Sequence, residues 1–360
     1  MSRKFHKRGL FSQNRNSGGM WHTLKKMILG LLLCLLLFFG ALFLFPVVPS
    51  QPNASQSLGY QVKIQPQSGL SAIADQLSGQ GLRVTPFLLK FGASSLLVAG
   101  KLKPGTYLLE FRASLGGVLL QIARGDRVRE SIAIIPGMTI WQVRALVDAH
   151  PSLLHQTKGM SSKELLKILH LNYPGAEGLF YPDTYIFDPD EVDINIYRRS
   201  IQAMQKQLTL AWEGKAASSP LKTPYELLIL ASIVEKETGR SSDRDLIAAV
   251  FTNRLKKGML LQTDPTVIYG IGSQFDGNLR KADLRKDSPY NTYMRKGLPP
   301  TPIAMPSKDS LQAASHPAIS AALYFVAKGD GSSHFSSSLY EHEAAVDRYQ
   351  RRTAKTPVNP

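Results

Sequence analysis

The sequence predicts an α+β protein in which a single N-terminal transmembrane helix is followed by a small mixed module and a mainly helical domain that carries a β-hairpin. Three observations lead to this prediction. Residues 27–45 are apolar without interruption, residues 59–128 alternate between strand-like and helix-like patterns, and several later segments repeat their apolar residues with a helical period. At 360 residues the chain is long enough for about two domains.

The apolar run at residues 27–45 predicts an uncleaved membrane anchor. Its nineteen residues contain no charged or amide side chain. As a helix they would span roughly 28 Å, close to the thickness of the hydrocarbon core of a bilayer. Seven basic residues and no acidic residue precede the run, so the positive-inside rule places residues 1–26 in the cytoplasm and the rest of the chain across the membrane. A cleaved signal peptide is the alternative, but its apolar region is usually only about 7–15 residues long.

Charge and cysteine content exclude several kinds of protein. The formal net charge is +16, and the chain has one cysteine, so it cannot form an internal disulfide or a cysteine-rich zinc site. A basic surface outside the membrane suits anionic lipid headgroups or an anionic cell-wall polymer. Nucleic acid is a disfavoured partner because the basic residues beyond the N-terminal tail are scattered along the chain.

Residues 46–57 are rich in proline, serine and glutamine and predict a linker between the anchor and a first module at residues 58–130. In this module the pattern predicts strands at 60–64 and 106–111 and helices at 71–77, 86–97 and 115–123.

A second domain is predicted at residues 131–355. Its expected elements are a strand at 131–135, helices at 139–150, 162–171, 195–212, 224–237 and 242–257, a hairpin at 324–327 and 334–336, and a last helix at 339–351. Residues 258–306 are rich in Gly, Pro, Asn, Asp and Tyr and predict a long irregular segment, which in a compact domain is usually functional.

The helix predicted at residues 224–237 offers a candidate catalytic acid. It is apolar nearly all round and ends in Glu235-Lys236-Glu237, with Gly239 positioned as a C-cap. Residues two apart on a helix point about 200° away from each other, so only one of the two glutamates can face a given cleft. The negative end of the helix dipole and partial burial both raise a carboxyl pKa, which suits a general acid. Two solvated glutamates at a helix end are the alternative interpretation.

Several separate motifs resemble one known family, the YceG-like endolytic murein transglycosylases (MltG). They are residues 177–185 (EGLFYPDTY), 233–238 (IVEKET), 262–270 (QTDPTVIYG), 289–293 (PYNTY), 297–304 (GLPPTPIA), 315–317 (SHP) and 323–327 (LYFVA). The resemblance runs from about residue 59 to residue 351 and is dense only after residue 177.

The resemblance implies that Glu237 is the catalytic residue, that residues 58–130 are a LysM-like glycan-binding module, and that residues 131–355 are a lysozyme-like catalytic domain. The implied reaction is a lyase reaction without a cofactor or metal ion. It cleaves the bond between N-acetylmuramic acid and N-acetylglucosamine in nascent glycan strands, leaves 1,6-anhydro ends and terminates strand elongation. Candidate sugar-binding residues, each of which could instead hold the irregular segment together, are Gln262, Asp264, Tyr269, Tyr290, Asn291 and Tyr293. Asp264 precedes a proline and is expected in a turn rather than as a second acid.

The expected partners are peptidoglycan glycan strands, the inner membrane and peptidoglycan synthases, with the catalytic domain in the periplasm. A non-catalytic, membrane-tethered scaffold that binds peptidoglycan is the main alternative. A pyridoxal-phosphate lyase is a third interpretation, but it requires a Schiff-base lysine and a phosphate site in a cytosolic enzyme, against the predicted topology.

Overall fold

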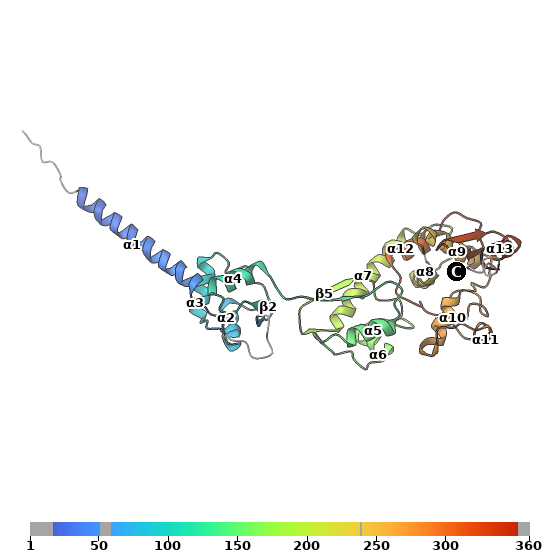
Figure 1. Ribbon diagram of the computed structural model, residues 1–360, viewed down its shortest axis with the longest axis horizontal. Coiled ribbons are helices and arrows are strands. Elements are labelled where there is room, and N and C mark those ends of the chain that lie inside the picture. Colours follow the sequence, from blue (N-terminus) through green and yellow to red (C-terminus); the bar gives the residue numbers. More distant parts are fainter. Residues whose placement is uncertain (1–16, 51–58, 238–239, 352–360) are drawn as a thin grey trace, which may run out of the picture. The chain divides into compact units, whose positions relative to one another are not determined.

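The computed structural model describes residues 17–50, 59–237 and 240–351, and these divide into two compact units, one ending at Arg129 and the other beginning at Glu130. Figure 1 shows the elements of both units. The chain combines α-helices and short strands, with one apolar N-terminal helix and a mostly helical second unit. This agrees with the fold class predicted from the sequence at the level of its secondary structure.

The first unit consists of α1 (Ser17–Leu44), β1 (Tyr60–Ile64), α2 (Leu70–Gly79), α3 (Pro86–Ser95), β2 (Gly105–Leu109) and α4 (Leu115–Arg124). Strands β1 and β2 pair antiparallel, with Tyr60 opposite Leu109 and Ile64 opposite Gly105. The helices bury Ile73, Leu89 and Leu119 against this pair. Helix α1 includes the stretch Trp21–Leu44, the one stretch in the described part of the chain that is long and apolar enough to cross a membrane.

The predicted linker differs from the structure at its start. Val47 and Val48 are buried in the core of the first unit. The Val47 amide donates to the carbonyl of Ala113 at 2.9 Å, and the Val47 carbonyl accepts from the amide of Arg83 at 2.9 Å. These residues therefore belong to the module, because two adjacent valines are apolar enough to add to its core even between prolines. The remainder of the predicted linker falls largely at residues 51–58, outside the described residues.

The second unit has a largely buried helix, α8 (Pro224–Glu237), in its core. Its other long elements are α5 (Ile140–Asp148), α6 (Ser162–Ile168), α7 (Ile194–Glu213), α9 (Arg244–Lys256), α12 (Lys308–Ser315) and α13 (Leu339–Val346), which a π-helical turn, Asp347–Arg351, extends. Three strand pairs complete it: β3 (Glu130–Ala133) with β5 (Thr184–Phe187), β4 (Leu153–Leu154) with β6 (Glu191–Val192), and β7 (Tyr324–Ala327) with β8 (Ser333–Ser336).

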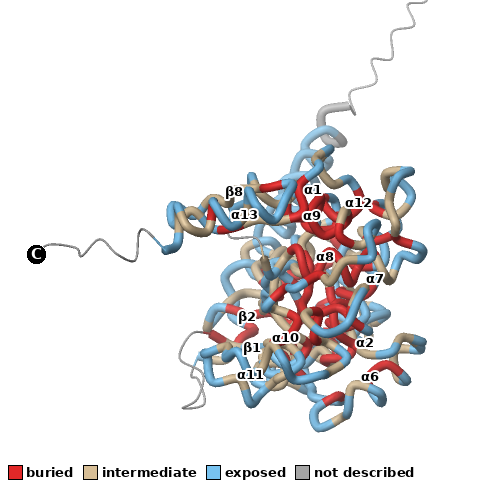
Figure 2. Tube along the Cα trace, turned by 90° about the vertical axis from the view of Figure 1, so that its right-hand side faces the viewer, coloured by how far each residue is buried: buried red, intermediate tan, exposed pale blue. Residues whose placement is uncertain are grey.

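Helix α8 is buried because it is apolar on every side. All eight residues from Leu227 to Val234 are buried, in contact with α7, α9, α10 (Asp264–Ile271) and α12. Figure 2 shows the buried residues of this helical core in red. The one polar side chain in this stretch, Ser232, donates to the carbonyl of Ile229 at 2.7 Å and accepts from the amide of Ile303 at 3.0 Å. The buried part of α8 thereby also fixes the end of the segment that was predicted to be irregular.

That segment is more regular than the sequence predicted. It contains α10 (Asp264–Ile271), a 3₁₀ turn (Gly272–Gln274) and α11 (Lys281–Arg285). The prediction that Asp264 lies in a turn was wrong, because Asp264 and Pro265 open α10. Proline fits the first turn of a helix as well as it fits a turn, since the amide that it lacks has no helical acceptor there.

Asn291 holds the segment together. Its side-chain amide nitrogen donates to three carbonyls at the end of α11, those of Asp283, Leu284 and Lys286, at 3.3, 3.0 and 2.7 Å. Its side-chain oxygen accepts from the amide of Tyr293 at 2.9 Å. The side chain is buried, so its donors and acceptor are used within the protein.

We therefore expect Asn291→Ala to lower the free energy of unfolding by about 1–3 kcal/mol, because it leaves several polar backbone groups without their partner. Urea titration followed by circular dichroism measures this. Asn278→Ala is the matched control, since the Asn278 side chain is exposed in the same segment and surface changes usually stay within about 0.5 kcal/mol. Equal stability of the two variants would contradict the structural role assigned to Asn291.

Candidate active site

The last turn of α8 sends three successive side chains in three directions, as the rotation of about 100° per residue requires. The Glu235 carboxylate accepts from the amide of Ser307 at 2.8 Å and from its hydroxyl at 2.5 Å, and Ser307 is the N-cap of α12. The Lys236 ammonium group donates to the carbonyl of Gly137 at 3.4 Å. Glu237 lines an open groove. Gly239, the predicted C-cap, lies outside the described residues.

The groove around Glu237, called here the Glu237 groove, has a volume of about 610 Å³. Its walls come from α8, α9, the start of α10, the segment after α11, the β7 strand and α13. The lining residues are Glu237, Arg254, Leu261, Gln262, Asp264, Tyr293, Tyr324, Phe325, Val326, Ala327, Leu339, His342, Val346 and Gln350. A space of this size can take part of an extended polar ligand.

Burial raises the pKa of the Glu237 carboxyl above its usual value. A hydrogen bond from the hydroxyl of Thr263 opposes this effect because it stabilises the ionised form, and the negative charge of Asp264 adds to it. The net direction is upward. Glu237 therefore keeps its proton to a higher pH than an exposed glutamate would.

Thr263 is aimed at Glu237 by a small network of buried threonines. Its amide donates to the hydroxyl of Thr292 at 3.1 Å, and its carbonyl accepts from the hydroxyl of Thr266 at 2.8 Å. The Thr266 and Thr292 hydroxyls are 2.9 Å apart. Thr263 occupies the N-cap position of α10, yet its hydroxyl makes no capping bond. That hydroxyl points to the Glu237 carboxylate instead.

Sequence reasoning did not single out these threonines, although all three lie within the quoted motifs. The spacing of Thr263 and Thr266 at the start of a helix was the available signal, but α10 itself was not predicted. Thr292 gave no signal of its own.

Arg254 organises the opposite wall of the Glu237 groove. Its guanidinium group is largely buried and donates to the carbonyl of Leu323 at 2.7 Å, the carbonyl of Leu261 at 2.9 Å and the side-chain oxygen of Gln262 at 3.2 Å. It also lies 5.0 Å from the centre of the Tyr324 ring. Arg254 thus joins three parts of the wall and brings a positive charge to it.

Tyr293 and Asp264 form a pair in the same groove. The Tyr293 hydroxyl donates to a carboxylate oxygen of Asp264 at 2.5 Å. Burial raises the pKa of Tyr293, and the Asp264 charge raises it further. The tyrosine therefore remains a donor, and the Asp264 oxygen that it binds is already occupied.

A second cavity, of about 540 Å³, is lined by Lys236, by Pro265 and Tyr269 of α10, and by Trp141 of α5. The rings of Trp141 and Tyr269 are stacked with their centres 5.1 Å apart. Trp141 is 52% exposed, so its ring is open to a ligand. Sequence reasoning missed Trp141, whose only signal was a large aromatic residue in a short amphipathic helix.

Glu177 helps to position Tyr269. The Tyr269 hydroxyl forms a hydrogen bond with the Glu177 carboxyl group. The Glu177 carboxyl is buried and accepts from the amide of Ile140, the first residue of α5, at 3.0 and 3.1 Å. Burial raises the pKa of Glu177 to about 7. Glu177 therefore links the first residue of α5 to Tyr269 of α10.

The seven residues predicted from the sequence therefore separate into three groups. Glu237, Gln262, Asp264 and Tyr293 line the Glu237 groove, and Tyr269 lines the second cavity. Tyr290 and Asn291 are not among the lining residues of either: the Tyr290 hydroxyl lies 2.9 Å from that of Thr301, its ring packs 5.0 Å from that of Tyr269, and Asn291 binds backbone carbonyls.

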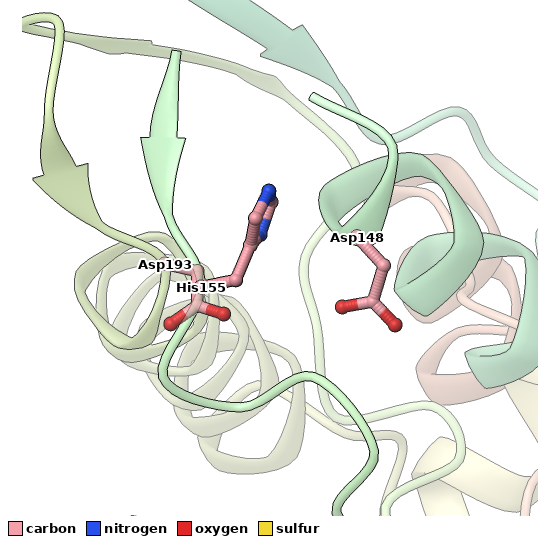
Figure 3. Close-up of side chains that lie close together, drawn as sticks. All are labelled: Asp148, His155 and Asp193. Carbon is pink, nitrogen blue, oxygen red and sulfur yellow. The ribbon is translucent and has the colours of Figure 1, made fainter. Parts of the chain in front are cut away.

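Among the described residues, Asp148, His155 and Asp193 are close enough to hold a metal ion, with ligand atoms within 4.8 Å of one another. Figure 3 shows the three side chains, which come from the end of α5, the loop after β4 and the start of α7. The Asp193 carboxylate already accepts from the amides of Gln156 and Thr157 at 3.1 and 3.0 Å and from the Thr157 hydroxyl at 2.8 Å. These bonds account for the buried Asp193 without a metal ion.

Comparison with known proteins identifies relatives. An endolytic murein transglycosylase of Bacillus subtilis is 46% identical over 176 residues, which cover 48% of this chain and 48% of the relative. One of Streptococcus pneumoniae is 34% identical over 192 residues, covering 51% of this chain and 34% of the relative. The matched region thus spans about half or less of these relatives' own length.

A crystal structure of a YceG-like protein from Listeria monocytogenes superimposes with a TM-score of 0.52 and 29% sequence identity, covering 79% of this chain and 98% of the other. The model of the YceG-like family matches residues 62–348, most of the chain and all of the residues that line the Glu237 groove except Gln350. The chain belongs to the YceG-like family.

Proposed function

We propose that this protein is an endolytic murein transglycosylase that cuts peptidoglycan glycan strands with Glu237 as its acid and base. The observation that carries the proposal is a single carboxyl group with a raised pKa at the end of a buried helix, open to a groove. A general acid needs this combination of a retained proton and access to the substrate. The relatives from Bacillus subtilis and Streptococcus pneumoniae are named endolytic murein transglycosylases, which supports the proposal.

The reaction needs only one acid. Protonated Glu237 donates to the oxygen that joins C1 of N-acetylmuramic acid to N-acetylglucosamine, and the C–O bond breaks. The resulting carboxylate, stabilised by the Thr263 hydroxyl, takes the proton of the muramyl C6 hydroxyl while that oxygen bonds to C1. The products are a 1,6-anhydro end and a free hydroxyl on N-acetylglucosamine. Hydrolytic glycosidases use two carboxylates to handle water or a covalent intermediate, and an internal hydroxyl removes that need.

The groove offers suitable sugar contacts. Gln262, Asp264 and Tyr293 provide hydrogen-bonding groups beside Glu237, and Arg254 provides a positive charge for anionic groups of the substrate. Trp141 and Tyr269 offer an aromatic platform in the second cavity, where sugar faces can stack. Tyr290 and Asn291 act by holding the segment in shape.

The remaining parts of the chain fit a role at the cell membrane. We assign residues 27–45 to a single span of the inner membrane, residues 1–26 to the cytoplasm and the rest to the periplasm. Residues 58–130 act as a LysM-like glycan-binding module and residues 131–355 as a lysozyme-like catalytic domain. Cutting nascent strands beside peptidoglycan synthases would end their elongation.

A comparison of Glu237→Gln with Glu235→Gln tests the proposal. We expect Glu237→Gln to lower kcat by roughly 10²–10⁴-fold or more, because the amide cannot transfer the proton. Glu235→Gln should retain substantial activity and lose about 1 kcal/mol of stability, since it weakens only the bond to the N-cap of α12. Release of soluble fragments from purified glycan strands measures activity, and thermal unfolding measures stability.

If Glu235→Gln were inactive and Glu237→Gln active, Glu235 would be the catalytic acid instead of Glu237. Full activity in both variants would contradict single-acid catalysis. A wild-type protein that binds glycan strands without cutting them would favour the non-catalytic scaffold.

Substitution of the two neighbours of Glu237, Thr263 and Asp264, should shift the alkaline limb of the pH profile of kcat in opposite directions. The acid must be protonated, so activity falls as pH rises through the pKa of Glu237, which is raised. Thr263→Val removes a bond that lowers this pKa and should move the alkaline limb to higher pH. Asp264→Asn removes a charge that raises it and should move the limb to lower pH.

The profile is measured with glycan strands at saturating concentration. Asn278→Ala, a change at an exposed residue, is the control and should leave the profile in place. Shifts of the same sign in the two variants, or no shift in either, would show that Glu237 does not control the alkaline limb.

A further inference from the structure

Helix α3 of the first unit exposes a row of large apolar side chains. Phe87 is 73% exposed, Leu88 46% and Phe91 49%, and Leu97, just beyond the helix, is 80% exposed. The rings of Phe87 and Phe91, one helical turn apart, are stacked with their centres 6.0 Å apart. These four residues are called here the α3 patch. Clustered apolar groups of this kind on a surface usually mark a site of contact.

Leu97 is held outward by an unusual backbone conformation. Its φ is 57°, in the left-handed region that a side chain such as leucine rarely adopts. The Leu97 amide donates to the carbonyl of Ser94 at 3.0 Å, and the following residue, Val98, is buried in the core. This conformation ends α3, because the Val98 amide then donates to the carbonyl of Ala93 at 2.8 Å, and it leaves the Leu97 side chain exposed.

The α3 patch is continuous with the apolar helix α1. The Phe91 ring packs edge-on against that of Phe38 in α1, with ring centres 4.8 Å apart. Leu42 of α1 is buried in the core of the first unit, and Gly92 of α3 gives it room: a Cβ at Gly92 would lie 3.1 Å from the Leu42 side chain. Phe43 lies against Gly116 of α4 in the same way. The end of α1 is therefore packed on the module.

This packing determines the depth of the patch once α1 crosses a bilayer. Phe38 precedes Leu44, the last residue of α1, by six residues, which is roughly 9 Å along a helix. Interfacial amphipathic helices bury their apolar faces about 5–10 Å into the boundary between headgroups and acyl chains. Phe91, at the level of Phe38, lies in that range.

The charge of the module suits the same surface. Residues 59–129 contain nine basic and three acidic residues. Lys90 lies within α3 between Phe87 and Phe91 and is exposed. A lysine in that position can bury its carbon chain and extend its ammonium group to lipid phosphates.

We infer that the α3 patch is inserted into the bilayer beside the α1 span, so that lipid acyl chains cover it and the first unit is attached to the membrane at two adjoining places. This rests on the proposed membrane span of α1. Attachment at two places restricts the rotation and tilt of the module on its anchor. It keeps the module at the membrane surface instead of letting it swing on a linker.

Fluorescence quenching by lipids brominated on their acyl chains tests the inference. The 360-residue chain with Cys34→Ser receives one new cysteine and a polarity-sensitive dye, and is reconstituted in phosphatidylcholine vesicles containing phosphatidylglycerol. Leu88→Cys is the test site. Leu36→Cys, exposed on α1, reports whether the span is inserted, and Asp75→Cys, exposed on α2, is the aqueous control.

We expect quenching at Leu88 to be roughly threefold or more above that at Asp75, with strong quenching at Leu36. Adding Phe87→Glu and Leu97→Glu, both at exposed positions, should reduce quenching at Leu88 and leave Leu36 unchanged. Strong quenching at Leu36 with none at Leu88 would overturn the inference while keeping the anchor, and would leave a protein partner to cover the patch. No quenching at Leu36 would refute the anchor and the inference together.

Discussion

The complete burial of α8 is the constraint on which the site depends. Close packing on every side and the hydrogen bond from the Ile303 amide to the Ser232 hydroxyl keep this helix from rotating, so the directions of its last three side chains follow from the core rather than from the surface. Glu235 is used to begin α12, Lys236 reaches the carbonyl of Gly137, and Glu237 is left facing the groove. A rotation of 100° would bring Lys236 to the groove in place of Glu237, and the tightly packed core resists it.

The groove then sets the chemistry of Glu237 by a balance between burial and hydrogen bonding. Burial favours the neutral acid, and the Thr263 hydroxyl stabilises the carboxylate that remains after the proton has left. A group that must first give and later take a proton needs both effects. Thr266 and Thr292 matter to the proposed reaction because they fix the direction of that hydroxyl.

The sequence predicted those parts of the fold whose signal is local and periodic. The bounds of α8, residues 224–237, follow from its apolar run and its charged end, and the two glutamates of its last turn do point in different directions, as helix geometry requires. Helices α10, α11 and α12, each of eight residues or fewer, were missed, whereas α6 and α13, which are as short, were predicted as parts of the longer stretches 162–171 and 339–351. Gln262, Asp264 and Tyr293 were found through motif resemblance, whereas Thr263 and Arg254 act through contacts between distant segments that no local pattern displays. Tyr290 and Asn291 belong to the same motifs, yet their contacts hold the segment together, so a motif alone does not separate the two roles.

In the proposed reaction one carboxyl group drives an internal displacement instead of hydrolysis, and the chemical nature of the new chain ends distinguishes the two. Purified protein is incubated with intact glycan strands, and the masses of the fragments are measured by mass spectrometry without prior chemical reduction of their ends. We expect 1,6-anhydro-muramyl ends, each lighter by one water than the corresponding reducing end. Fragments that carry reducing N-acetylmuramic acid ends would contradict it, because they would require a water molecule to be activated in the groove.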